Sequence, residues 1–224
     1  MQLFLASTSL EFRGVLKHCS QVRRAPQRVV WARSALFQGK PVLLLANGAG
    51  EHRAYAALDA AKDAAKESNP KFVCNVGFCG ALDPQLKIGD IVVSDSALQP
   101  RSPRPFRTGA FYCADHVVQT VREKSELHSA GFAAVDMESA GAARRARELG
   151  IPFYAVKAVS DLACKELRCD YNRALRDDGS ISVMSLSLQA ITRPLTCLPD
   201  LVRFGRNALR ASECIGEFLA GCEF

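Results

Sequence analysis

Short apolar runs alternate with helix-forming stretches along most of this chain. The runs 41–46, 72–76 and 153–159 are rich in Val, Leu and Phe and are flanked by Gly or Pro, which is typical of buried strands. Alanine-rich amphipathic segments at 52–68 and 139–149 predict helices. Strands that alternate with helices predict an α/β fold of three layers, α/β/α, with a central mixed, largely parallel sheet.

The rest of the chain fits the same architecture. We expect further strands at 1–7, 28–31, 88–93 and 132–137. Residues 77–80 predict a glycine turn after a strand, and 99–109 predict an exposed loop rich in Pro and Arg. A chain of 224 residues can bury one sizeable core, so we expect a single domain over 1–224, with a basic helical tail over about 181–224.

Composition excludes several classes of protein. No apolar run approaches the roughly 18–20 residues of a membrane span. The opening MQLFLASTSLEF lacks a basic region and carries Glu11 too early for a signal peptide. Nine cysteines without a CxxC pair, and four scattered histidines, predict free thiols in a reducing cytoplasm and no zinc site.

The formal net charge of +6 is unevenly distributed. In the tail, Arg203, Arg206 and Arg210 fall at spacings of three and four, on one side of a helix beside apolar residues, which predicts peripheral contact with a membrane. The alternative is a helix that packs on its own domain. Aromatic residues make up 8% of the chain and do not interleave with a basic stripe, so nucleic acid is not an expected partner.

Carboxylates follow three of the expected strands. Glu11 comes shortly after the first, Asp136 and Glu138 end or follow the strand at 132–137, and Asp161 follows the strand at 153–159. In open α/β sheets, ligands bind at the carboxyl ends of strands. The sequence therefore predicts a pocket for a small polar molecule that carries hydroxyls and a leaving group.

Each of these signals also has a purely structural interpretation. Asp161 could cap the segment that follows it, and Glu138 could be a first-turn helix residue favoured by the helix dipole. Glu11 could be a solvated helix residue. The turn with Gly48 and Gly50 contains half of a dinucleotide-binding fingerprint and lacks the third glycine, so dinucleotide binding is not expected.

Three strings are more specific when they are taken together and in order. They are CNVGFCGALDPQLKIGDIVVSD at 74–95, AVDMESAG at 134–141 and IPFYAVKAVSD at 151–161. They resemble the glycine loop with its following strand, the ribose-binding motif and the base-site strand of the nucleoside phosphorylase/nucleosidase superfamily. That superfamily includes purine nucleoside phosphorylase, uridine phosphorylase and methylthioadenosine/S-adenosylhomocysteine nucleosidase. The stretch 171–179 and the Arg-rich tail are similar to the hopanoid-associated phosphorylase branch, which releases adenine from adenosylhopane.

The resemblance implies an enzyme that cleaves the N-glycosidic bond of a purine nucleoside, with adenine as the expected base and a substituent on the 5′ side. It assigns Asp161 to purine N7, as proton donor or hydrogen-bonding group, and Glu11 to activation of water. Among the substrate-binding positions, it implies that Met137 packs on the sugar, that Glu138 accepts hydrogen bonds from the ribose hydroxyls and that Ser160 orients Asp161. The other substrate-binding positions that it implies are Asp136, Gly77, Phe78 and Gly80. An acid role at neutral pH would require the pKa of Asp161 to rise from about 3.9 towards 7, which is roughly 4 kcal/mol.

The chain departs from the family pattern where phosphate would bind. Phosphorylases of this group carry Arg at the position of Asn75 and Ser at that of Phe78, and the Phe78 side chain cannot donate a hydrogen bond. We therefore expect hydrolysis rather than phosphorolysis, unless Arg53 or another basic residue substitutes. The region between 95 and 131 is also shorter than in the nucleosidases, which leaves the substrate open.

The resemblance also bears on cofactors and partners. It implies no metal or organic cofactor, with inorganic phosphate as co-substrate only if the enzyme is a phosphorylase. A small-molecule nucleoside is the expected ligand, and a homo-oligomer is the expected assembly, with a dimer favoured. The alternative function is a catalytically weak nucleoside-binding or interaction module that has kept the fold.

Overall fold

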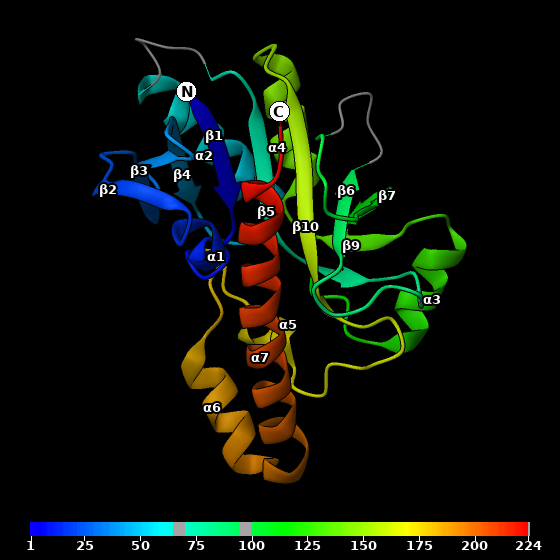
Figure 1. Ribbon diagram of the computed structural model, residues 1–224. Helices are drawn as coiled ribbons and strands as arrows, with labels where there is room; N and C mark the ends of the chain where they lie inside the picture. Colours follow the sequence, from blue (N-terminus) through cyan, green and yellow to red (C-terminus); the bar gives the residue numbers. More distant parts are fainter. Residues whose placement is uncertain (65–69, 95–99, 224) are drawn as a thin grey trace.

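A computed structural model describes residues 1–64, 70–94 and 100–223 (Figure 1). Its strands are β1 (Gln2–Ala6), β2 (Cys19–Arg24), β3 (Trp31–Phe37), β4 (Lys40–Ala46), β5 (Val73–Ala81), β6 (Ile91–Ser94), β7 (Arg107–Gly109), β8 (Phe111–Cys113), β9 (Ala134–Asp136) and β10 (Phe153–Asp161). Its helices are α1 (Arg13–Leu16), α2 (Glu51–Ala64), α3 (Val121–Ser129), α4 (Ser139–Glu148), α5 (Tyr171–Ala174), α6 (Val183–Thr192) and α7 (Pro194–Ala220).

One mixed sheet organises the fold. Its main path runs β2-β3-β4-β1-β5-β10-β6-β7, while β9 pairs with β5 and β8. The four central strands β4, β1, β5 and β10 are mutually parallel. Antiparallel strands flank them, with β3 on one side and β6 on the other. This arrangement brings the carboxyl ends of β1, β5 and β10 to the same edge.

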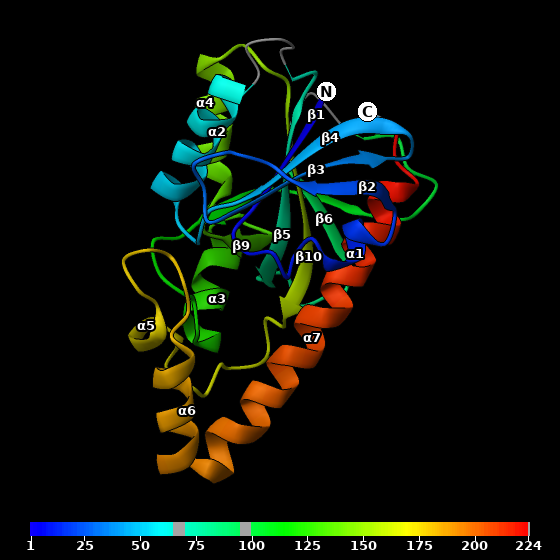
Figure 2. The ribbon, with the colours of Figure 1, turned by 90° about the vertical axis from the view of Figure 1, so that its left-hand side faces the viewer.

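Helices cover both faces of the sheet, which confirms the three-layer α/β/α prediction (Figure 2). Side chains alternate along β1, so that Phe4 faces α7 and α1 while Leu3 and Leu5 face α2 and α4. On the second face, alanines of α2 and α4 form most of the helical contact. An added Cβ at Gly141 would lie 2.1 Å from the Glu51 carbonyl oxygen, so only glycine allows α4 to approach α2 this closely.

Several sequence expectations need correction at the edges of the sheet. No strand covers 28–31; instead β3 begins at Trp31 and pairs with β2, a strand that the sequence did not reveal. Most of β2 is polar and exposed, so it has no apolar periodicity. The strand expected at 88–93 begins only at Ile91, and the expected loop at 99–109 ends in the short strand β7.

The glycine turn expected at 77–80 is also wrong, because β5 continues as a strand from Val73 to Ala81. Gly77 adopts a φ of +149°, which a glycine reaches without strain, and the strand passes through it. The helix expected at 52–68 is described as far as Ala64. Residues 65–68 of that expectation, residue 95 of the first family-like string and residue 99 of the expected loop lie outside the described residues.

Candidate active site

A pocket of about 170 Å³ lies at the carboxyl ends of β1, β5, β9 and β10, on the side of the sheet towards α5 in Figure 1. Eight of the nine predicted site residues line it: Glu11, Phe78, Gly80, Asp136, Met137, Glu138, Ser160 and Asp161. The parallel centre of the sheet explains this convergence, because parallel strands end on one edge. Polar groups that are far apart in the sequence therefore face one small cavity.

Glu11 is held by the loop that follows β1. Its Oε2 accepts hydrogen bonds from the Ser7 hydroxyl and the Thr8 amide, both at 2.7 Å, and its Oε1 accepts one from the Phe78 amide at 2.9 Å. The residue is 2% exposed. Donors from Ser7 and Thr8 in this loop and one backbone amide of β5 thus fix the carboxylate at the pocket wall.

Gly77 explains how Glu11 comes so close to the sheet. An added Cβ at this position would lie 2.4 Å from Glu11 Oε1 and 3.3 Å from the Lys157 ammonium nitrogen. Gly77 is the one predicted site residue that does not line the pocket. It lies behind Glu11 and leaves room for the carboxylate and the ammonium to approach each other.

A buried lysine that the sequence analysis did not single out lies between Asp136 and Glu138. Lys157 of β10 is fully buried, and its Nζ lies 3.0 Å from Asp136 Oδ2 and 3.1 Å from Glu138 Oε2. Asp136 also accepts the amide and hydroxyl of Ser139 at the start of α4. Burial disfavours the ammonium, but the carboxylates of Asp136, Glu138 and Glu11 outweigh burial and raise the pKa of Lys157.

One ammonium cannot neutralise three neighbouring carboxylates. Burial raises the pKa of Glu138 to about 7, with further contributions from Asp136 and Glu11 that Lys157 only partly offsets. Glu138 therefore exchanges a proton near neutral pH. In its ionised form it has free lone pairs that can accept two hydroxyl donors.

The pKa of Glu138 has a consequence for stability that can be measured without knowing a ligand. Its native pKa of about 7 lies above the ordinary value of 4.5, so the native state holds a proton that the unfolded state releases as the pH rises between these values. Between about pH 4.5 and pH 8, we expect the free energy of unfolding of the wild type to fall by about 3 kcal/mol relative to that of Glu138→Gln. Urea unfolding of both proteins across this range measures the difference, and a difference that does not change with pH would contradict the assignment.

Asp161 lies at the end of β10 and faces the same cavity, with 13% of its side chain exposed. Its Oδ2 is 2.5 Å from the ammonium nitrogen of Lys124 in α3, and its Oδ1 is 3.4 Å from the Ser160 hydroxyl. Burial raises the pKa of Asp161, while Lys124 opposes the rise. The Ser160 hydroxyl therefore orients the Asp161 carboxyl, whose pKa lies above its ordinary value.

Lys124 is the second buried lysine near the pocket that the sequence did not reveal. It is fully buried, and it also donates to the carbonyls of Leu162 and Lys165 at 3.0 and 3.1 Å. All three ammonium protons therefore have acceptors. The Lys124 side chain ties α3 to the loop after β10 and holds the Asp161 carboxyl in place.

Two of the three residues considered for phosphate binding, Asn75 and Arg53, lie away from the cavity. Asn75 is buried in β5 and donates to the Leu5 carbonyl at 3.2 Å, and the Arg53 guanidinium donates to the Asp177 carbonyl at 3.1 Å. Neither lines the pocket, and no arginine is among the described residues that do. Four carboxyl groups, two buried ammoniums and the His116 imidazole lie in the pocket or directly beside it.

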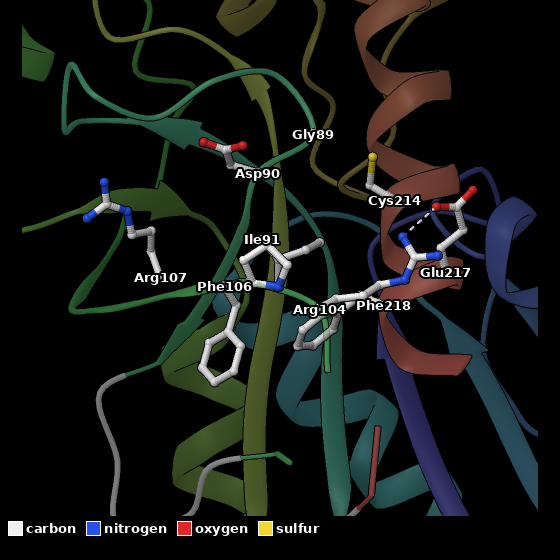
Figure 3. A pocket seen from close by; sticks show the side chains of 10 residues that line it. Gly89, Asp90, Ile91, Arg104, Phe106, Arg107, Cys214, Glu217 and Phe218 are labelled. Atoms are coloured by element: carbon white, nitrogen blue, oxygen red, sulfur yellow. Dashed lines mark hydrogen bonds and ion pairs between the residues drawn. The ribbon is translucent and has the colours of Figure 1, made fainter. Parts of the chain in front are cut away.

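A larger cavity of about 290 Å³ lies elsewhere, between α7 and the chain before β6 and β7 (Figure 3). It is lined in part by Asp90, Phe106 and Phe218, and an ion pair between Arg104 and Glu217 at 2.9 Å stands at its wall. Its basic groups are therefore partly neutralised, and none of the predicted site residues reaches it. The candidate active site is therefore identified by the carboxylates that converge on it and not by its volume.

A family model described as the Phosphorylase superfamily matches residues 5–103 and 100–180. The chain belongs to this superfamily. A methylthioadenosine/S-adenosylhomocysteine nucleosidase from Marinomonas sp. (strain MWYL1) is 27% identical in an alignment of 169 positions, and the match covers 58% of this chain and 72% of that protein. One from Staphylococcus aureus (strain MRSA252) is 24% identical in an alignment of 144 positions, and the match covers 47% of this chain and 63% of that protein.

Solved structures of the superfamily share the whole fold with this chain. The S. pneumoniae 5′-methylthioadenosine/S-adenosylhomocysteine nucleosidase, bound to a transition-state inhibitor, aligns with a TM-score of 0.68 at 15% identity and covers 99% of this chain and 97% of its own. The futalosine hydrolase of Helicobacter pylori aligns with a TM-score of 0.67 at 14% identity, over 97% and 94% of the two chains. At these identities the likeness establishes the fold, including the mixed sheet and its two helical layers.

Proposed function

We propose that this chain hydrolyses the N-glycosidic bond of a purine nucleoside that has adenine as its base and a substituent at the 5′ position. Superfamily membership and the nucleosidase relatives support an enzyme that cleaves N-glycosidic bonds. The observation that carries the finer proposal is the position of Glu11. Its carboxylate is fixed in the pocket beside Lys157 and Glu138, while Asp161 faces the same cavity from β10.

In the proposed reaction, water attacks C1′ of the ribose and gives a proton to Glu11. The C1′–N9 bond breaks, its electron pair passes to the purine, and N7 takes the proton of the Asp161 carboxyl. Glu138 accepts hydrogen bonds from the ribose hydroxyls and Met137 packs on the sugar. The products are the free base and the free sugar, and the reaction includes no metal or organic cofactor.

Two features of the pocket support water over phosphate as the nucleophile. The Phe78 amide, which lies in the glycine-rich part of β5, already donates to Glu11. The described lining contains no arginine, the side chain that binds a phosphate dianion through two parallel hydrogen bonds. Hydrolysis is therefore proposed, and phosphorolysis would require a phosphate site formed by other residues.

The proposed 5′ substituent is large and apolar, as in adenosylhopane. Two observations support it: the similarity of 171–179 and the tail to the hopanoid-associated branch, and the apolar side chains of Val117, Leu167 and Phe204 along the pocket. We further propose that the enzyme is cytoplasmic and acts as a homo-oligomer, with a dimer favoured, as the superfamily resemblance implies.

Release of free base from a panel of adenosine derivatives, each with and without phosphate, tests the proposal. The panel should vary the 5′ group from hydroxyl through methylthio to long alkyl. Adenine released without phosphate supports a hydrolase, and release only with phosphate would overturn hydrolysis. Binding of nucleosides without release of base in either condition would instead support the alternative, a binding module that has kept the fold.

Replacing Lys124 tests whether the proton on Asp161 matters. In Lys124→Met, burial still raises the pKa of Asp161 but the ammonium no longer opposes it, so we expect the pKa to rise further. The protonated form of Asp161 then persists to higher pH. The pH at which kcat falls on the alkaline side therefore increases. Rates of adenine release across the pH range measure the shift, and Lys124→Arg serves as the control that keeps the charge. An unmoved alkaline limb would contradict proton donation by Asp161.

A further inference from the structure

Helices α6 and α7 form a hairpin joined at Arg193, and they extend beyond the sheet (Figures 1 and 2). The second half of α7 packs on the sheet through residues such as Ile215 and Phe218. Its first half packs instead on α6 and on the segment before α5, through a small separate cluster around Cys197 and Tyr171. The hairpin therefore has its own core, and its outer side does not contribute to the core of the domain.

The outer side of the hairpin carries a continuous set of exposed apolar residues. We call this set the hairpin face: Val183, Met184, Leu188, Ile191, Leu195, Leu198 and Val202. From Met184 onward these positions follow spacings of three and four, which places those of each helix on one side. Ile191 is 76% exposed and Leu195 is 89% exposed, although large apolar side chains usually lie inside.

Within the hairpin, residues 183–212, the exposed charges are all of one sign. Arg193 and Arg206 are exposed on the hairpin, and α6 carries no charged residue. The single acidic residue between 183 and 212 is Asp200, which is buried, pairs with Arg203 and accepts the amides of Arg168 and Cys169. The hairpin thus presents an apolar surface bordered by guanidinium groups.

A groove on α7 also combines apolar side chains with guanidinium groups. It has a volume of about 450 Å³ and is lined by Leu198, Pro199, Val202, Arg203, Arg206 and Asn207. Apolar side chains therefore lie directly beside two guanidinium groups. This pairing suits a molecule that joins an acyl chain to an anionic headgroup.

We propose that the hairpin face seats this protein on the surface of an anionic lipid bilayer. The apolar residues would enter the headgroup–acyl boundary while Arg193 and Arg206 meet the anionic headgroups. A second copy of the chain is a poorer match, because its hairpin face would bring the same arginines and no exposed carboxylate to pair with them. None of the described helices combines the length and apolar character of a membrane span, so the contact is peripheral.

The proposal goes beyond the proposed function and does not depend on it, although the two surfaces are neighbours. Phe204 of α7 packs in the small core of the hairpin and also lines the candidate active site. None of the seven residues of the hairpin face lines that pocket. Catalysis and membrane contact can therefore be altered separately.

Sedimentation of the full chain with vesicles tests the proposal. We expect binding to vesicles of phosphatidylcholine with about one third phosphatidylglycerol, little binding to phosphatidylcholine alone, and weaker binding as salt increases. The variant Ile191→Asp/Leu195→Asp should bind at least about 10-fold more weakly. Val30→Asp is the matched control, because Val30 is 73% exposed and lies outside the hairpin.

Adenine release by each variant serves as a separate readout. Unchanged release by the double variant, together with lost sedimentation, supports the proposal. Wild type that stays in the supernatant with anionic vesicles overturns it, and so does a double variant that binds as well as wild type. It is also overturned if wild type forms a dimer in solution that the double variant does not, because a second copy then covers the face.

Discussion

Asp161→Asn is expected to lower kcat for base release by about 10²–10⁴-fold, the usual contribution of a general acid. Asparagine preserves the shape of the side chain and can still approach purine N7, but it has no carboxyl proton to transfer. The position of the carboxyl supports the prediction, because it faces the pocket, is oriented by Ser160 and has a pKa raised by burial. Single-turnover measurement of adenine release separates this step from product release.

Lys124 provides the control for this variant. Asn in place of Asp161 leaves the buried ammonium of Lys124 without a counter-charge, which costs about 3–5 kcal/mol in comparable buried pairs. Lost activity in the single variant could then reflect lost folding. The double variant Lys124→Met/Asp161→Asn removes both charges, so we expect unfolding experiments to show recovered stability while adenine release stays low. Activity that returns with stability would contradict the acid role of Asp161.

The centre of the fold can be predicted from sequence because it is governed by burial on both faces. The strands around Leu44, Cys74 and Val156 read as short continuous apolar runs, which is what a parallel sheet covered by two helical layers requires. The edges cannot be predicted in the same way. In β2 the residues from Ser20 to Arg24 are exposed and mostly polar, and its pairing with β3 is fixed by the neighbouring strand rather than by its own pattern.

The candidate site also contains residues that can be predicted from the sequence and residues that cannot. Its carboxylates can be predicted because each follows a recognisable strand, and ligands bind where parallel strands end. The buried cations are not visible in this way. Lys124 lies 37 residues before Asp161 in a helix whose pattern gives no sign of a buried charge, and Lys157 sits within an apolar strand. Their roles follow from tertiary contacts alone.

The second large effect is expected at Glu11. Glu11→Gln retains the size of the side chain and an oxygen that can accept the Phe78 amide, but it cannot take a proton from water. We expect kcat for hydrolysis to fall by about 10²–10⁴-fold with a much smaller change in KM, because the missing interaction forms only in the transition state.

A matched variant separates the basicity of Glu11 from its placement. Ser7→Ala removes the hydroxyl that donates to Glu11 Oε2 at 2.7 Å, while the Thr8 and Phe78 amides still hold the carboxylate. Because Glu11 can still accept a proton in this variant, its kcat should fall far less than that of Glu11→Gln. Equal losses in the two variants would mean that Glu11 acts by position alone. Hydrolysis at the wild-type rate by Glu11→Gln would mean that another group activates water, and Glu138, which exchanges its proton near pH 7, would be the next carboxylate to replace.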